Sequence, residues 1–277
     1  MGTVRSKDGT KIAFDAWGTG RPLIMVDGAT AHRAVNPVYA EVGRLLADEF
    51  RVYAYDRRGR GESTDTAPYA VEREIEDIAV LIADAGGGPA AVFGGSSGAV
   101  LALDAAAAGL PISHLALFEP PFVVDDSRPP LPVDYVERLD AAVAEGRPGD
   151  AAALFMTAAV GLPEEAVAGM RRSDFWPAVE AVAHTIAYDG RIIGTTMSGA
   201  PLPAGRWAAI GVPVLVMHGT ATMPWLITAA QALAGLLPTA TLLPVPGENH
   251  ATTADVLASA LRQFAQGRPE AGVRPGK

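Results

Sequence analysis

The chain has 277 residues, 49% of them hydrophobic, with a formal net charge of −9 and no cysteine. Its length and hydrophobic content are enough to bury the core of one large domain. The negative charge argues against a nucleic-acid partner, because phosphate contacts require a clustered basic surface. Without cysteine, the chain has no disulfides, thiolate nucleophiles or zinc–thiolate sites.

Other features of the sequence bear on location, metals and assembly. The N-terminal residues are too polar for a signal peptide, and no uninterrupted apolar run of about 18 residues occurs, so we expect a cytoplasmic protein without a membrane partner. The five histidines show no helical i, i+4 pair with a carboxylate between them, so we expect no metal, and we expect no cofactor. The oligomeric state stays open, with a homodimer as one alternative.

The first 120 residues alternate short apolar strands with amphipathic helices. The patterns predict strands over 11–17, 23–26, 51–55, 90–93 and 113–118, and helices over 37–48, 70–85 and 97–108. A turn-rich loop over 56–63 follows one of these strands. The alternation is typical of a mostly parallel sheet, here expected to have eight strands and helices on both faces, with ligand groups at the carboxyl ends of the strands.

Between residues 121 and 206 the strand pattern stops. Amphipathic helical stretches take its place over 133–145, 150–160, 163–172 and 175–187. We interpret this segment as a helical cap inserted after the sixth strand. Strands resume over 212–217 and 240–245, with helices over 225–237 and 252–266. The expected core therefore comprises 1–120 and 207–266, and the polar tail 267–277 is expected to be disordered.

Residues 94–98 read Gly-Gly-Ser-Ser-Gly, which matches the G-x-S-x-G pattern of a nucleophile elbow. An apolar strand precedes the pattern and an alanine-rich helix follows it. Small neighbours are needed there, because strand and helix approach each other closely around a strained serine. We predict Ser96 as the nucleophile; a glycine-rich turn with an incidental serine is the alternative. The elbow resembles that of the α/β-hydrolase fold family.

A serine hydroxyl needs a base that takes its proton, and the base needs an acid that orients it. His250 lies in a loop between the last strand and the last helix, where the α/β-hydrolase family places its base. The family most often places the acid shortly after the seventh strand, but no carboxylate occurs between residues 191 and 246. Glu119, which directly follows the sixth strand, is therefore the favoured acid. Asp125 and Asp126 are weaker alternatives at the start of the cap.

Attack on a carbonyl produces an oxyanion, which backbone N–H groups stabilise. We expect one donor from Ser97, directly after the nucleophile, and the other from Gly28 or Ala29 after the third strand. Six further side chains are candidates for substrate contact, although aromatic and Met residues at helical spacing are more often core. These candidates are His32, Met156, Trp176, His184, Tyr188 and Met223.

The resemblance to the α/β-hydrolase fold covers residues 1–266 and includes the loop over 56–63. Within that family, the Val-Asp-Gly of 26–28, the elbow, the glutamate after strand six and the acid-free loop after strand seven resemble the zearalenone lactonases. In those enzymes a Ser-Glu-His triad opens a macrolactone. The resemblance implies Ser96, Glu119 and His250 as triad, whereas Thr222 occupies the family's commonest acid position.

These observations predict a cofactor-free serine hydrolase that cleaves a small-molecule carboxylic ester or lactone through an acyl-enzyme. One alternative is a non-hydrolytic relative, such as a cyclase or lyase of natural-product metabolism, since the fold hosts many chemistries. Another is a catalytically silent relative that only binds a ligand. An epoxide hydrolase or dehalogenase is disfavoured, because those relatives need a carboxylate at the position of Ser96.

Overall fold

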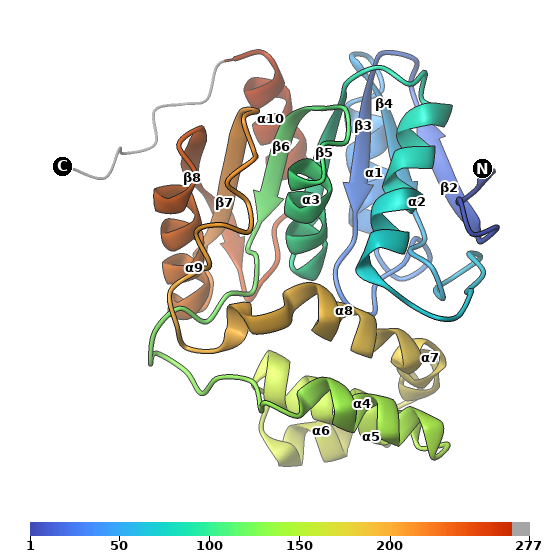
Figure 1. The fold of residues 1–277 in the computed structure, drawn as a ribbon, viewed down its shortest axis with the longest axis vertical. Helices are drawn as coiled ribbons and strands as arrows, with labels where there is room; N and C mark the ends of the chain where they lie inside the picture. Colours follow the sequence, from blue (N-terminus) through green and yellow to red (C-terminus); the bar gives the residue numbers. More distant parts are fainter. Residues whose placement is uncertain (268–277) are drawn as a thin grey trace.

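The computed structural model describes residues 1–267 and contains an eight-stranded sheet with helices on both faces (Figure 1). The spatial order is β1-β2-β4-β3-β5-β6-β7-β8; β2 pairs antiparallel with both β1 and β4, and all other neighbouring strands pair parallel. This confirms the predicted fold class. The strands are β1 (Gly2–Arg5), β2 (Lys11–Trp17), β3 (Arg21–Val26), β4 (Phe50–Tyr55), β5 (Ala90–Gly95), β6 (Ile112–Phe118), β7 (Val214–Ala221) and β8 (Ala240–Glu248).

The central strands are apolar on both faces because helices cover both sides of the sheet. On one side α1 (Pro37–Leu45) packs beside α10 (Ala254–Ala265), and their buried residues share one hydrophobic cluster. On the other side α2 (Val71–Asp84), α3 (Ser97–Ala107) and α9 (Pro224–Leu236) contribute to a second cluster. The alanine-rich α3 is almost wholly buried, since short side chains let it lie close to the sheet.

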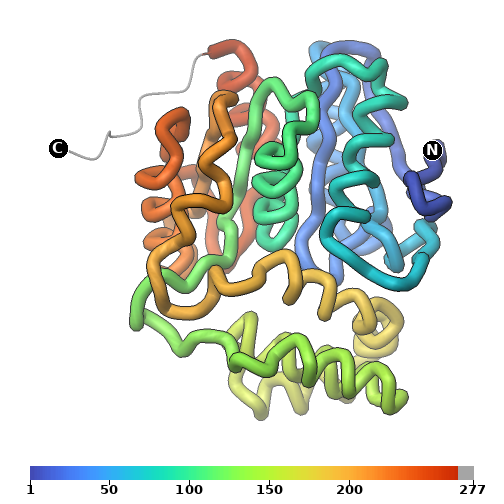
Figure 2. Tube along the Cα trace, viewed as in Figure 1, coloured from blue at the N-terminus to red at the C-terminus, as the bar shows by residue number. Residues whose placement is uncertain are grey.

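The segment between β6 and β7 is helical, and within the described residues it adds no strand to the sheet. It contains α4 (Tyr135–Ala144), α5 (Pro148–Leu154), the π-helical turn η1 (Phe155–Val160), α6 (Glu164–Met170), α7 (Trp176–Val182), η2 (Ala183–Thr185), α8 (Ile186–Ile193) and η3 (Gly194–Met197). We refer to residues 121–206 as the cap. Helix α8 runs along the carboxyl end of the sheet, between the sheet and the other cap helices (Figure 2).

Three differences from the predicted elements stand out. An additional edge strand, β1, precedes the first expected strand, and its side chains alternate between half-buried and exposed. Helical structure in the cap continues beyond residue 187 as α8, after a short 3₁₀ turn. The expected disordered tail lies outside the described residues except for Gly267. Over the part of the chain that the structure describes, no helix has both the length and the apolar character of a membrane span.

Candidate active site

The nucleophile elbow forms where β5 passes into α3, as the glycine pattern predicts. Ser96 lies between them with φ 55° and ψ −128°, a conformation that non-glycine residues rarely adopt. A Cβ added to Gly94 would lie 2.4 Å from the carbonyl oxygen of Gly98, and one added to Gly98 would lie 2.4 Å from that of Val26. Backbone therefore touches backbone on both sides of the serine, which explains why small residues surround it.

Glu119 and His250 meet across the ends of β6 and β8. The Glu119 carboxylate is fully buried; its Oε2 lies 2.5 Å from Nδ1 of His250, and its Oε1 accepts the N–H of Gly219 at 2.8 Å. A carboxylate at Nδ1 keeps a proton on that nitrogen and leaves Nε2 able to accept one. Thr222 accepts the backbone N–H of His250 at 3.3 Å, so it contacts the histidine loop rather than the imidazole.

Backbone strain is concentrated at this end of the sheet. Among the described residues, every non-glycine residue with positive φ lies in a loop that follows β3, β5, β6 or β8. Each such conformation costs on the order of 1–3 kcal/mol and persists mainly where surrounding structure enforces it, as in active sites. The strain marks the same location as the sequence motif, and at the four strained residues outside the motif it is an independent indication. The residues are Thr30, Ser96, Glu119, Asn249 and His250.

A cavity of about 680 Å³ lies between these loops and the cap. Ser96 and His250 both line it, together with the expected backbone donors. Asp27 is the acidic residue of the lining, and no lysine or arginine of the described chain contributes to it. The rest of the wall is mainly aliphatic and aromatic, so the site is an apolar chamber with a few polar groups at one end.

One of the six expected substrate contacts, Met223, lines this cavity, and the other five lie elsewhere. Met156 and Trp176 pack into the hydrophobic core of the cap itself. His184 and Tyr188 instead meet Asp65 outside the cavity, with the Tyr188 hydroxyl donating to Asp65 Oδ2 at 2.7 Å. His32 is also absent from the lining. The structure therefore does not bring these five residues to the cavity that contains Ser96 and His250.

The apolar wall of the cavity includes residues that sequence reasoning missed, most of them from the cap. They come from η1 and the turn after it, from the end of α8, from η3 and from the start of α9. Their only signal in the sequence is hydrophobicity, which a cap core and a cavity wall share. The main members of this set are Phe155, Val160, Leu162, Ile193, Met197 and Trp225.

The backbone donors beside Ser96 are not equivalent. The N–H of Gly28 already donates to Asp27 Oδ1 at 3.1 Å, whereas the N–H of Ala29 meets no acceptor within the described residues. Ser97 is the first residue of α3, so its N–H has no partner inside the helix. The geometry therefore favours Ala29 over Gly28 as the second donor, opposite Ser97.

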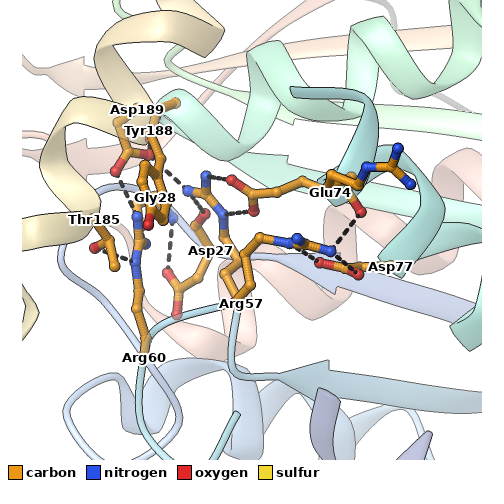
Figure 3. Close-up of polar contacts among 12 residues, drawn as sticks. Asp27, Gly28, Arg57, Arg60, Glu74, Asp77, Thr185, Tyr188 and Asp189 are labelled. Carbon is orange, nitrogen blue, oxygen red and sulfur yellow. Dashed lines mark hydrogen bonds and ion pairs between the residues drawn. The ribbon is translucent and has the colours of Figure 1, made fainter. Parts of the chain in front are cut away.

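Asp27 places a buried carboxyl group next to these donors. Its oxygens accept from the Asn36 amide at 3.0 and 3.1 Å, and its side chain is turned toward Gly28 (Figure 3). Burial raises the pKa of Asp27 to about 6, although the hydrogen bonds from Asn36 and Gly28 favour the charged form. The cavity wall therefore gains one negative charge, on Asp27, as the pH rises through about 6.

Comparison with solved structures gives the same fold. An alpha/beta hydrolase from Sphaerobacter thermophilus DSM 20745 is 50% identical, with a TM-score of 0.85 over 95% of this chain and 100% of that one. The enol-lactonase from Burkholderia xenovorans LB400 has a TM-score of 0.68 over 96% of this chain and 100% of its own, but at 21% identity the likeness concerns the fold alone.

Sequence comparisons complete the assignment. The uncharacterized hydrolase YraK of Bacillus subtilis (strain 168) is 34% identical over 99 residues, and the match spans only 35% of this chain and 35% of that protein. A far longer match covers residues 16–266, which fit the model of the alpha/beta hydrolase family. This span includes the elbow, Glu119 and His250 together with most of the sheet, and the chain accordingly belongs to the alpha/beta hydrolase family.

Proposed function

We propose that this protein hydrolyses a carboxylic ester or lactone through an acyl-enzyme formed on Ser96. The observation that carries the proposal is the buried Glu119 carboxylate, 2.5 Å from Nδ1 of a histidine that shares one cavity with the strained serine. A nucleophile, a base and an acid that orients the base are the parts that acyl transfer requires. Sequence order supports the same roles, since Ser96, Glu119 and His250 follow one another as in other members of the fold.

In the proposed reaction, Nε2 of His250 takes the proton of the Ser96 hydroxyl while Oγ attacks the substrate carbonyl carbon. The N–H groups of Ala29 and Ser97 donate to the resulting oxyanion, and the Glu119 carboxylate stabilises the imidazolium. His250 then returns the proton to the leaving alcohol as the acyl-enzyme forms. Water attacks this acyl group with His250 as base and releases the acid; a lactone would leave as one hydroxy acid.

The cavity supports an uncharged substrate. Its volume of about 680 Å³ falls within the range of small-molecule sites, and its wall is mainly apolar. The resemblance of the Asp27 segment, the elbow and Glu119 to the zearalenone lactonases supports lactones as one substrate class beside simple esters. We therefore infer neutral esters and lactones as substrates.

Labelling with a fluorophosphonate and hydrolysis of an aryl ester test this proposal together. We expect stoichiometric labelling of wild type at Ser96, and loss of both labelling and roughly 10³-fold or more of kcat in Ser96→Ala. Ser259→Ala removes an exposed serine on α10 and should behave like wild type. Labelling without release of acid would indicate a non-hydrolytic enzyme, and the absence of both would indicate a ligand-binding protein; either result contradicts the proposal.

A further inference from the structure

A cluster of buried charges joins the cap to the loops around the nucleophile. Asp189 of α8 is 1% exposed, and its carboxylate accepts from Arg57 Nη1 at 2.6 Å and from Arg60 Nη2 at 2.5 Å (Figure 3). Both arginines belong to the loop after β4 and are equally buried. Glu74 of α2 binds the other side of Arg57 through two hydrogen bonds of 2.7 Å. Two guanidinium groups and two carboxylates thus neutralise one another away from water.

Stability alone is a poor explanation for this cluster. Desolvation of charges is costly, and well-packed apolar side chains of similar volume are often at least as stabilising as a buried ion pair. Burial by itself raises the pKa of Asp189, but the charges of Arg57 and Arg60 beside it hold that pKa below its ordinary value. The carboxylate is therefore kept ionised where it lies, and its further contacts show what the ionised group holds.

The first of these contacts reaches the helix that follows the nucleophile. The Ser97 hydroxyl donates to Asp189 Oδ1 at 2.7 Å, and all atoms of this contact are buried. Ser97 is the first residue of α3, and its backbone N–H is one of the two donors proposed for the oxyanion. A hydrogen bond from its side chain to a fixed carboxylate restrains the backbone of that residue.

The second contact reaches the other donor through Arg60. Arg60 Nη1 donates to the carbonyl oxygen of Gly28 at 2.6 Å, while its Nη2 donates to Asp189. The carbonyl of Gly28 and the N–H of Ala29 belong to one planar trans peptide, in which the two groups point in opposite directions. Holding the carbonyl against Arg60 therefore directs the N–H of Ala29 away from the cluster. A charged donor on that carbonyl also polarises the peptide and strengthens its N–H as a donor.

We propose that Asp189, a residue of the cap, is a positioning residue for the oxyanion hole. It fixes Ser97 directly, and it fixes the peptide between Gly28 and Ala29 through Arg60. The inference rests on the proposed function, because it assigns a role to these donors in acyl transfer. If Asp189 has this role, catalysis requires α8 to lie where Asp189 can make these contacts. The end of the same helix also lines the cavity.

Asp189→Asn tests the role, because it keeps the size of the side chain and removes its charge. We expect kcat on a neutral aryl ester to fall roughly 30-fold or more while KM changes less than about threefold, since oxyanion donors act mainly in the transition state. Asp77→Asn is the matched control. Asp77 is equally buried and binds Arg58 through two hydrogen bonds of 2.8 Å, but it does not contact residues 27–29 or Ser97.

Inhibitor binding separates positioning from general weakening of the fold. A trifluoromethyl ketone forms an oxyanion adduct with the serine, whereas the acid product does not. Asp189→Asn should therefore weaken binding of the ketone by about the same factor as kcat and leave binding of the product nearly unchanged. Ser97→Ala, which deletes one hydroxyl and keeps the backbone N–H, should show the same pattern at roughly 3- to 10-fold.

The outcomes distinguish this inference from the proposed function. Equal losses in Asp189→Asn and Asp77→Asn, or unchanged ketone binding in Asp189→Asn, would make the cluster merely structural and overturn the inference alone. If Asp189→Asn does not fold, Ser97→Ala decides, and wild-type kcat and ketone binding in that variant would overturn it as well. A wild-type protein that hydrolyses no ester would overturn the proposed function and the inference with it.

Discussion

The two carboxylate oxygens of Glu119 hold two different parts of the site. One lies against the ring of His250, and the other accepts a backbone N–H from Gly219 of β7. Glu119 makes both contacts from a backbone conformation with a positive φ of 47°, directly after β6. Thr222, at the end of β7, reaches only the backbone of His250. In the proposed function, the acid is therefore the residue at the end of strand six, and the residues at the end of strand seven support it.

Glu119→Gln should therefore lower kcat strongly. The amide keeps the size of the side chain and can still accept from Gly219, but it then presents an N–H₂ group to Nδ1 of His250, which enforces the wrong tautomer. By analogy with the Asp-to-Asn change at this role we expect a loss of roughly 10³- to 10⁴-fold, with little change in melting temperature. Thr222→Val is the control and should stay within about tenfold. A Glu119→Gln enzyme that also stays within about tenfold would refute the Ser-Glu-His assignment.

Asp27 gives a prediction about stability and pH. Its pKa of about 6 in the folded protein lies above the ordinary carboxyl value of 3.8, so the fold favours the protonated form. The raised pKa of Asp27 adds to the free energy of unfolding; this stabilisation is fully present below pH 4 and is lost as the pH rises through 6. The stability lost on ionisation of Asp27 is on the order of 3 kcal/mol. Asp27→Asn cannot ionise. Its melting temperature relative to wild type should therefore rise between pH 4 and pH 7.5, and a pH-independent difference would contradict the raised pKa.

At the scale of the elements, the junction of β3, β5 and α3 is fixed by backbone contact. Gly98→Ala should disrupt it, because the new Cβ would lie 2.4 Å and 2.6 Å from the carbonyl oxygens of Val26 and Asp27, which cannot move independently of β3. We expect a loss of roughly 3 kcal/mol or more in the free energy of unfolding. Gly88→Ala, where no atom lies within 4 Å, should stay within about 1 kcal/mol in the same denaturant titration. Equal stabilities would contradict the steric account.

The sequence predicts best those elements in which one physical requirement, such as burial on both faces or close backbone contact, determines the residue types. The inner strands, such as β3, are apolar on both faces, and the elbow needs small residues; both requirements leave a clear pattern. The edge strand β1 has four residues, half of them exposed, so its alternation is too short to stand out. The sequence pattern predicts a cap helix that ends at residue 187, whereas α8 continues to Ile193. The short 3₁₀ turn η2 changes the phase of the hydrophobic pattern before α8 begins, so the pattern does not show the continuation.

At the scale of the whole molecule, the cavity belongs to neither the core nor the cap alone. Phe155 lines it, whereas the adjacent Met156 packs into the cap core, and hydrophobicity does not distinguish the two positions. Asp189 contacts side chains that are 92 to 132 positions away in the sequence, and no local sequence pattern predicts such pairs. Glu119 could be found because the region after strand seven lacks carboxylates. The sequence therefore predicted the groups to which we assign the reaction, whereas the residues that surround them depend on how the cap packs on the core.

The charge of the molecule and of its cavity predicts which esters it excludes. The chain carries a net charge of −9, Asp27 is the acidic residue of the cavity wall, and no lysine or arginine of the described residues lines it. An anionic acyl chain would lose its hydration without gaining a cationic partner, a cost of several kcal/mol. A neutral acyl chain of the same length instead gains from the apolar wall.

A matched series of aryl esters measures this effect. We expect kcat/KM for an aryl hemisuccinate to be roughly 100-fold or more below that for the aryl butanoate, which has a methyl group in place of the terminal carboxylate. The aryl methyl succinate, in which the free carboxylate of the hemisuccinate is a methyl ester, is the control, because it is neutral although it is larger. It should be cleaved about as well as the butanoate. If the hemisuccinate reacts within about threefold of its methyl ester, the cavity accepts anions and the inference of a neutral substrate is wrong.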